Sequence, residues 1–405
     1  MLDALKQVFR EPALRVTTLA LFFMGFTFAS TNPYLSVIAI GELNFSAQGY
    51  GAVLLVNTLI ATLGVVIIGQ LSDQAKNRKH AILVSFVVGF IGFGLFAAWP
   101  TTTTFLFCLF VASPIAISAF PQLFAVIRTL TIDDGKERAA EVNSAVRAVF
   151  ALSWILVPGL VGGFIAWTGR MSDAFAIAAI SYLLCFVFFH FFGPNIARTK
   201  TPQETATEGL RRAFRLVSRG AIFGRVGALA LIGLSHPVNA TLMPLIILGF
   251  EGGTTRDIGI IAGIVAALEI PFMLMGAALI KRIGLVWVII IGGILHTTYI
   301  LALMFSSEVI HVYALCLINA AGAAIILSLH LSYLQECLPH RPGLGTSLQS
   351  VEMLIQRGLS AGIIAGVGLM FGYPGALAIT AIGGAAGIGL LILVDRSPIS
   401  ETLMN

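Results

Sequence analysis

The sequence predicts an all-α membrane protein with twelve transmembrane helices, arranged as two pseudo-symmetric six-helix halves. Three observations lead to this prediction. The chain of 405 residues is 58% hydrophobic and only 11% charged, whereas soluble proteins carry about 25% charged residues. Apolar stretches long enough to cross a bilayer recur along the whole chain. Lys and Arg collect on one side of these stretches.

Twelve stretches are long enough to span the membrane, because a spanning helix needs about 20 apolar residues. Polar residues, Gly or Pro bound each of them. In the first half they are 14–40, 48–70, 80–99, 103–127, 145–168 and 173–193. In the second half they are 223–249, 258–280, 285–305, 309–335, 346–371 and 375–394. Most connections are short, so we expect consecutive helices to be antiparallel neighbours.

One connection is longer and more polar than the others. Residues 194–222 contain Thr201-Pro-Gln-Glu204 and the basic cluster Arg211, Arg212 and Arg215. We expect a cytoplasmic linker here, between an N-terminal half at 1–193 and a C-terminal half at 223–405. Its stretch 210–217 is expected to be an amphipathic surface helix. Residues 1–11 are expected to lead into the first span, without a cleavable signal peptide.

The basic residues indicate the topology. If the N-terminus is inside, only Arg170 and Arg256 are expected outside. The residues expected inside, besides the linker cluster, are Lys6, Arg10, Arg15, Lys76, Arg78, Lys79, Lys136, Arg138, Lys281, Arg282, Arg341 and Arg396. This asymmetry predicts that both termini are cytoplasmic, and an odd number of spans would abolish it.

Several function classes are disfavoured by the sequence. The net charge of +5 is spread over short clusters, so we expect no nucleic-acid partner. P-loop, G-x-S-x-G and H-E-x-x-H patterns are absent, so we expect neither ATP use nor an enzyme. Four distant cysteines are expected to be buried small hydrophobes, and we expect no metal and no cofactor. They are Cys108, Cys185, Cys316 and Cys337.

The two halves repeat a pattern of motifs. Pro33 in the first span corresponds to Pro244 in span 223–249, and the loop from Gly69 corresponds to the loop from Gly276. The loop GQLSDQAKNRK at 69–79 resembles the signature loop of the major facilitator superfamily, whose fold consists of two parallel six-helix repeats. The resemblance implies that Asp73 and Arg78 form a conformational switch, because an Asp at a helix end can pair with cations in one conformation only.

Further segments resemble the bacterial sugar efflux transporter family, a proton-linked branch similar to drug antiporters. They follow the family order along nearly the whole chain. These segments are Pro121–Arg128, Arg147–Pro158, Ala267–Met273, Lys281–Gly284 and Tyr333–Pro339. The resemblance implies export of sugars or glycosides against proton entry, by a monomer in the bacterial inner membrane.

The sequence also departs from its relatives in three places. The middle of span 103–127 lacks the Arg that drug antiporters carry there. The Gly-rich antiporter motif is reduced to Pro158-Gly159 and Gly162-Gly163. Span 346–371 carries Gln349, Glu352, Gln356 and Arg357 where the family tends to have smaller residues. The solute is therefore not restricted to plain sugars.

Glu269 and Arg357 are the sharpest candidates for chemistry, because ionisable groups inside a membrane are costly and commonly functional. Glu269 lies near the middle of span 258–280, and we expect it to couple proton movement to solute binding. Arg357 cannot readily lose its charge, so it requires a water-filled cavity or a carboxylate, with Glu269 or Glu352 as candidate partners. A purely structural ion pair is the alternative for both. Glu352 is expected nearer the cytoplasmic end, simply solvated.

Other polar residues are candidates for solute binding in a central cavity. A sugar site combines amides and acids with an aromatic platform, for which Trp154 is the candidate. Packing of Trp154, and hydrogen bonding of the others between helices, are the alternatives. The remaining candidates are Asn32, Asn57, Gln122, His236, Asn239, Asn319 and Gln356. Pro237 is expected to break the span beside His236, whereas His330 is expected to be structural or at the cytosolic gate.

Arg128 and Arg147 lie near the inner ends of their spans, and we expect one of them to pair with Asp73 in the outward-facing state. Lys79 is a further basic residue of this loop, for which setting the topology is the simpler reading. Spans 1, 4, 7 and 10 are expected to line the cavity, with spans 2, 5, 8 and 11 between the halves.

Rival functions remain open at this point. The same scaffold also serves for an exporter of drugs, peptides or siderophores, or for an importer. A membrane sensor that transports nothing would have a collapsed cavity and no counterflow. A membrane-embedded enzyme would need a nucleophile or a metal site.

Overall fold

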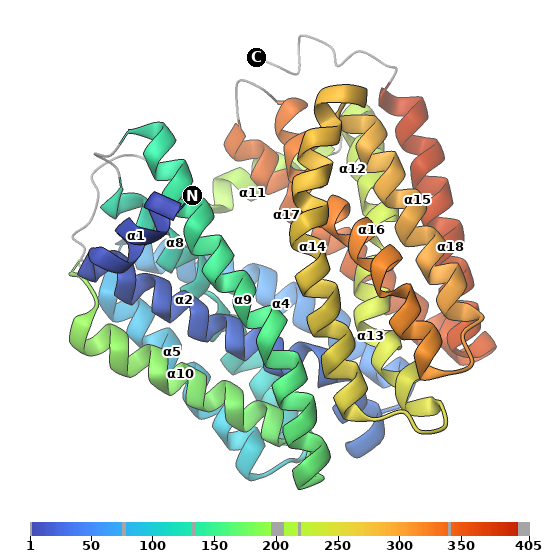
Figure 1. Cartoon of the computed structure of the whole chain (residues 1–405), viewed down its shortest axis with the longest axis horizontal. Helices are drawn as coiled ribbons and strands as arrows, with labels where there is room; N and C mark the ends of the chain where they lie inside the picture. The colour runs from blue at the N-terminus through green and yellow to red at the C-terminus, as the bar shows by residue number, and fades with distance from the viewer. Residues whose placement is uncertain are drawn as a thin grey trace. The chain divides into compact units, whose positions relative to one another are not determined.

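The computed structural model describes residues 2–74, 78–131, 135–195, 206–217, 220–338 and 342–395, and this described part is helical almost throughout, without a strand (Figure 1). The chain forms two compact units. The first contains Met1–Ile38, Ile60–Gln203 and Ile258–Gly263. The second contains Ala39–Leu59, Glu204–Asp257 and Ile264–Asn405.

Eleven segments of the described residues are long and apolar enough to cross a membrane. They coincide with eleven of the twelve predicted spans, so the prediction of an all-helical, multi-pass membrane protein is confirmed. The remaining range, 346–371, is occupied mainly by α17 (Pro342–Gly362) and the π-helical turn η5 (Ile363–Val367). α17 is less apolar than the other spans because it carries two amides and two charged side chains.

The first unit is a bundle in which α2 contacts α8, α9 and α10, while α5 packs on the opposite flank of α10. Aromatic side chains fill the space between α5, α6 and α10: the ring of Phe175 lies 4.5 Å from that of Phe96 and 5.5 Å from that of Phe93, centroid to centroid. The elements of this unit are α1 (Leu2–Arg10), α2 (Pro12–Thr31), η1 (Asn32–Tyr34), α3 (Leu35–Val37), the later part of α4 (Ala47–Gln74), α5 (Arg78–Ala98), α6 (Thr102–Phe107), η3 (Cys108–Ala112), α7 (Ser113–Ile117), α8 (Ala119–Leu130), α9 (Lys136–Thr168) and α10 (Asp173–Phe192).

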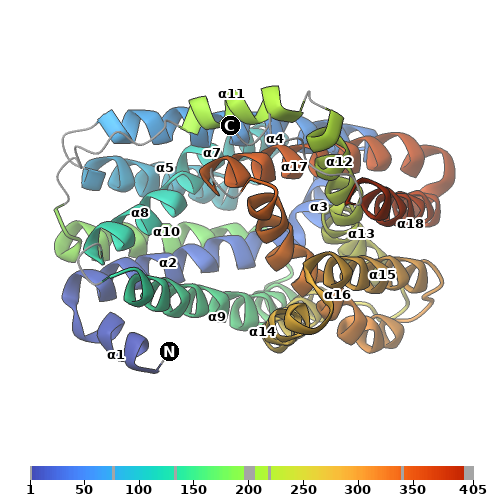
Figure 2. The same cartoon turned by 90° about the horizontal axis from the view of Figure 1, so that it is seen from above.

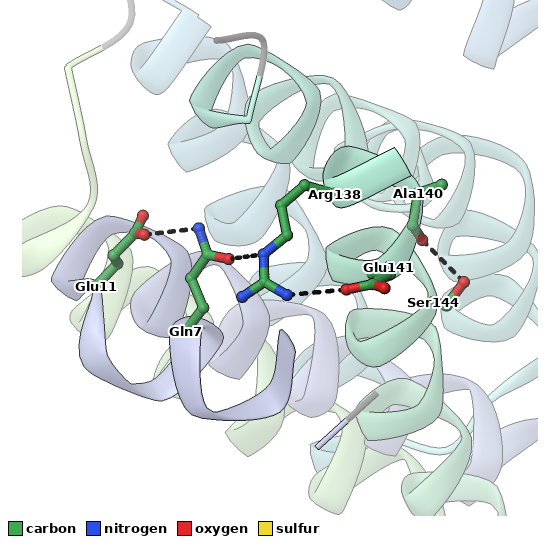
Figure 3. Close-up of polar contacts among 6 residues, drawn as sticks. All are labelled: Gln7, Glu11, Arg138, Ala140, Glu141 and Ser144. Carbon is green, nitrogen blue, oxygen red and sulfur yellow. Dashed lines mark hydrogen bonds and ion pairs between the residues drawn. The ribbon is translucent and has the colours of Figure 1, made fainter. Parts of the chain in front are cut away.

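α1 is tied to the beginning of α9 by side-chain hydrogen bonds (Figure 3). Arg138 Nε donates to Gln7 Oε1 over 2.8 Å, and the amide of Gln7 donates to Glu11 over the same distance. A second nitrogen of Arg138 pairs with Glu141 at 2.8 Å. The predicted N-terminal lead-in is therefore a helix anchored to its own unit.

The second unit packs α15 against α16 and α18, with α12 between α17 and α18 (Figure 2). Its further elements are η2 (Ile38–Glu42), the first part of α4, α11 (Ala206–Val217), α12 (Gly220–Gly233), α13 (Ser235–Gly249), α14 (Thr255–Ile283), α15 (Leu285–Met304), α16 (Val309–Glu336) and α18 (Gly368–Asp395). A capping box of Thr254 and Asp257 starts α14, and Gly284, with a φ of 86°, ends it.

The predicted amphipathic helix of the linker is confirmed as α11. Ala213 is fully buried in the apolar core of the second unit, whereas Arg211, Arg212 and Arg215 are exposed. α11 contacts α17 and α12 through its apolar face. This alternation is what an amphipathic surface helix requires.

Four predicted spans are not continuous helices, including the range 346–371 described above. The break predicted beside His236 is confirmed: α12 ends at Gly233 and α13 begins at Ser235. Pro237 has no N–H, so the carbonyl of Gly233 loses its usual helical donor. Two further ranges were expected to be continuous, and each contains a turn of irregular helix beside a proline. Range 14–40 is interrupted at η1 by Pro33, and range 103–127 at η3, next to Pro114.

Candidate functional site

A polar centre lies inside the second unit, around the ring of His296 on α15. This ring is fully buried, with Nδ1 at 2.6 Å from Ser235 Oγ and Nε2 at 3.2 Å from Asn319 Oδ1. An amide oxygen only accepts, so Nε2 carries a proton, while the Ser235 hydroxyl donates to the carbonyl of Ile232 over 3.1 Å. His296 thereby ties α15 and α16 to the first residue of α13, directly at the helix break.

A second hydrogen bond lies beside this centre. The buried hydroxyl of Tyr299 donates to Asn239 Oδ1 over 2.7 Å. The half-buried ring of His236 lies 6.5 Å from the ring of His296, centroid to centroid. The structure therefore brings three predicted residues together, His236, Asn239 and Asn319, and it holds the two amides in bonds between helices.

Sequence reasoning missed the residues that organise this centre, Ser235, His296 and Tyr299. His296 stands in the middle of predicted span 285–305. An ionisable residue at that depth is itself a signal of a functional or structural polar site. The bond to Ser235 had no signal, because those residues are 61 positions apart.

Glu352 on α17 has an environment opposite to the expected one. The residue is only 1% exposed, so the expectation of a solvated Glu352 was wrong. The physical reason is that two buried neighbours replace water: His330 Nδ1 lies 2.9 Å from Glu352 Oε1, and the amide of Gln356 donates to the same oxygen. The prediction that His330 is structural agrees with this contact, which joins α16 to α17.

The side chain of Gln356 occupies space that is left free by Gly233 on the neighbouring helix α12. It is buried, and a Cβ at position 233 would collide with its amide group. Gly233 is also the last residue of α12, immediately before the helix break. The amide of Gln356 thus donates to Glu352 and packs closely against Gly233, three residues before His236.

Arg357 and Glu269 have no bonded partner among the described side chains. Glu269 on α14 is half-buried, and Arg357 on α17 is exposed. The carboxylates proposed as partners of Arg357 do not pair with it: Glu352 is bound by His330, and no ion pair or hydrogen bond joins Arg357 to Glu269 within the described structure. The guanidinium of Arg357 acts electrostatically on the ring of His236 on α13.

The remaining binding candidates lie apart from this centre along the chain. In the first unit, Gln122 on α8 is buried, with its amide 3.4 Å from Ser118 Oγ. Asn32 in η1 is exposed, and Trp154 on α9 is half-buried. On α4, Asn57 Oδ1 is buried without a hydrogen bond in the described structure.

The predicted switch is only partly described. The side chains of Asp73 and Arg78 lie outside the described residues, so the expected pairing of Asp73 remains a prediction. Arg147 places its guanidinium 5.1 Å from the centre of the Phe124 ring, and Arg128 is exposed. Lys79 donates to the carbonyl of Gly193 over 2.8 Å, so it closes the end of α10 as a basic residue commonly does.

The described residues contain no group of three or more His, Cys, Asp or Glu placed to hold a metal ion. All four cysteines are free and buried, as predicted. The polar centre around His296 is formed by hydrogen bonds between side chains of α13, α15 and α16.

Comparison with known families and proteins gives a consistent result. The model of the family described as "Major Facilitator Superfamily" matches residues 17–354. A relative from Deinococcus radiodurans is 26% identical over 387 residues, which are 94% of this chain and 97% of the relative. Sugar efflux transporter A of Escherichia coli is 27% identical over 331 residues, covering 82% of this chain and 83% of that protein.

Solved structures share the fold at low sequence identity. The crystal structure of the nucleoside transporter NupG superposes with a TM-score of 0.77 at 14% identity, covering 96% of this chain and 100% of that one. A POT family transporter in complex with 5-aminolevulinic acid gives a TM-score of 0.71 at 12% identity, covering 96% of each chain.

Proposed function

We propose that this chain, which belongs to the Major Facilitator Superfamily, exports a small polar solute in exchange for protons. The proposed solute is a sugar or glycoside. The observation that carries the proposal is the set of curated relatives. Sugar efflux transporters A and C of Escherichia coli are each 27% identical to this chain, over 82% of its length. The similarity extends across nearly the whole carrier and is not confined to one loop. The chain is proposed to be a carrier with no enzymatic role.

The proposed mechanism is alternating access by two six-helix halves, 1–193 and 223–405, connected by the linker 194–222. Broken helices support a solute path, because irregular backbone at membrane depth is tolerated only inside protein or along a water-filled cavity. Such breaks occur at Pro33, Pro114 and Pro237, in three of the four spans proposed to line the cavity.

Glu269 is the proposed proton-coupling residue. Its carboxyl group is half-buried in α14 and has no bonded partner among the described side chains. Removal from water disfavours the charged form of a carboxyl group, and hydration restores it. A cycle that alternately wets and dries Glu269 would therefore load and release a proton.

The solute is proposed to meet amides and an aromatic ring, which suit the hydroxyl groups and the C–H face of a sugar. In the second unit these contacts come from His236, Asn239, Asn319, Gln356 and Arg357. In the part of the chain before the linker they come from Asn32, Asn57, Gln122 and Trp154. Asp73, Arg78, Arg128 and Arg147 are proposed to act on conformation and not on the solute.

The setting is proposed to be the bacterial inner membrane, with both termini in the cytoplasm and the protein acting as a monomer in lipid. The charge asymmetry supports this orientation, because basic residues concentrate on one side of the spans. α11, with its exposed arginines, is proposed to lie at the cytoplasmic surface.

The test is solute-induced proton movement in proteoliposomes that contain a pH-sensitive dye. Sugars and glycosides are added one at a time to the wild type and to Glu269→Gln, with Glu336→Gln as the control for loss of a carboxyl group. A pH signal with one sugar class that is lost only in Glu269→Gln supports the proposal. Silence across all sugars rejects sugar as the solute, and a full signal in Glu269→Gln rejects its role in proton coupling.

A further inference from the structure

Two ionisable side chains of α17, Glu352 and Arg357, have opposite environments. Glu352 is 1% exposed and receives hydrogen bonds from both His330 and Gln356. Arg357 is exposed and has neither a hydrogen bond nor an ion pair to any described side chain. The carboxyl group of Glu352 thus has hydrogen-bond donors inside the protein, whereas the guanidinium of Arg357 has no acceptor among the described side chains.

Some basic side chains of the described part do have such partners. Arg138 pairs with Glu141 at 2.8 Å, and Arg170 with Asp173 at 3.7 Å. Lys79 donates to the Gly193 carbonyl at 2.8 Å, and Arg147 lies over the ring of Phe124. Arg128 and Arg282 are exposed without such a partner, but they lie near the ends of their helices, whereas Arg357 lies well inside its predicted span.

The charge of Arg357 cannot be removed by proton loss, because a guanidinium stays protonated in proteins. An uncompensated guanidinium at the centre of a membrane span costs about 3 kcal/mol or more. The exposed positions on the same face of α17 are Thr346, Ser350 and Met353. Two of these three carry hydroxyl groups, which fits an aqueous surface better than a lipid-facing one.

Among the described residues, no carboxylate pairs with this charge. Glu352, five residues away on the same helix, is bound by His330 and Gln356. Glu269 forms no ion pair with Arg357 within the described structure. The titratable group on the neighbouring helix α13 is His236, itself a base, and Asn239 Oδ1 already accepts from Tyr299.

We propose that Arg357 binds an anionic group of the transported solute, a carboxylate or a phosphate, with His236 as the second donor. This inference rests on the proposed function and narrows it: the solute class is acidic sugars, such as uronic acids or sugar phosphates, and not neutral glycosides. The guanidinium suits this role because its planar fork donates two parallel hydrogen bonds to a carboxylate or phosphate.

An acidic solute also changes the charge balance of the exchange. Export of a neutral sugar against one proton moves one elementary charge across the membrane. Export of a singly charged acidic sugar against one proton moves two charges in the same electrical direction. Transport of the acidic sugar would therefore depend twice as steeply on the membrane potential.

The first experiment measures binding to the purified full chain in lipid nanodiscs, by calorimetry. The probes are glucuronate and glucose, which differ only at C6, together with glucose 6-phosphate. The expected result is about ten- to hundredfold tighter binding of at least one acidic probe than of glucose, because a hydrogen bond to a charged group contributes more than a neutral one. Arg357→Gln should abolish the difference, Arg357→Lys should keep part of it, and the control Arg282→Gln should leave it unchanged.

Several results would overturn the inference. Equal binding of glucose and both acidic probes, binding of no probe, or an unchanged preference in Arg357→Gln would each do so. Competition by chloride or inorganic phosphate as strong as that by glucuronate would make Arg357 a site for inorganic anions instead. Neutral sugars that still produce the pH signal would leave proton-linked export standing while removing the acidic solute, so the two proposals fail separately.

Discussion

The contact between His330 and Glu352 gives the most quantitative prediction, tested by replacing His330 with Leu. Both side chains are 2% exposed, and Nδ1 lies 2.9 Å from Oε1. Gln356 donates to the same oxygen, and an oxygen that faces two donors is best served by the ionised carboxylate. Leu at 330 leaves this carboxylate buried with the Gln356 amide as its remaining bonded donor among the described side chains.

The expected loss in the free energy of unfolding is about 3–5 kcal/mol, the usual effect of removing one partner of a buried charged pair. The double variant His330→Leu with Glu352→Leu should recover most of this loss, because the uncompensated carboxylate is gone. A neutral hydrogen bond between membrane helices would predict less, about 0.6 kcal/mol on average and at most about 1.7 kcal/mol.

The assay is reversible unfolding in mixed micelles of the two single variants and the double variant, read as a double-mutant cycle. His311→Leu on the same helix is the matched control, because His311 is exposed. A coupling energy above about 2 kcal/mol supports a charged pair. A coupling below about 1.7 kcal/mol, or losses that simply add, would refute this reasoning and would weaken the case that Glu352 is unavailable to Arg357.

Three further predictions concern packing, the polar centre and the switch. Gly233→Ala should destabilise the second unit by about 1–3 kcal/mol, because the new methyl group collides with the Gln356 amide; unfolding measurements should show relief in combination with Gln356→Ala, and no relief would contradict the contact. Asn319→Leu should cost about 0.6–1.7 kcal/mol in the same assay, because the Nε2 proton of His296 loses its acceptor, whereas an unchanged stability would place that bond in doubt. Asp73→Ala should lower transport while cysteine-labelling topology and unfolding stay unchanged, and normal transport would remove Asp73 from the switch.

The sequence was sufficient for the membrane fold, because apolar length and the positions of Lys and Arg are local properties of the chain. Pro237 likewise predicted the break between α12 and α13, since the missing N–H acts on the same helix. The span at α17 was harder to classify, because its polar residues make it less apolar than a typical spanning helix.

The candidate site was less predictable because its bonds join distant residues. The environment of Glu352 depends on His330, 22 positions earlier, and the ring of His296 meets Ser235, 61 positions earlier. Neither contact can be predicted from the spacing of residues along one helix. Glu269 and Arg357 were identifiable because a charge inside an apolar span is itself unusual, but the absence of an ion pair between them required the structure.

The central claim is that solute leaves in exchange for entering protons, and an imposed gradient tests it most directly. Proteoliposomes are loaded with a labelled sugar or glycoside that gives a signal in the pH-dye screen, and the external medium is then acidified. Proton antiport predicts that solute loss accelerates when the outside is acidic, slows when the outside is alkaline, and loses both effects with an uncoupler or in Glu269→Gln. Solute loss that ignores the gradient, or that is retarded by external acid, would contradict the account.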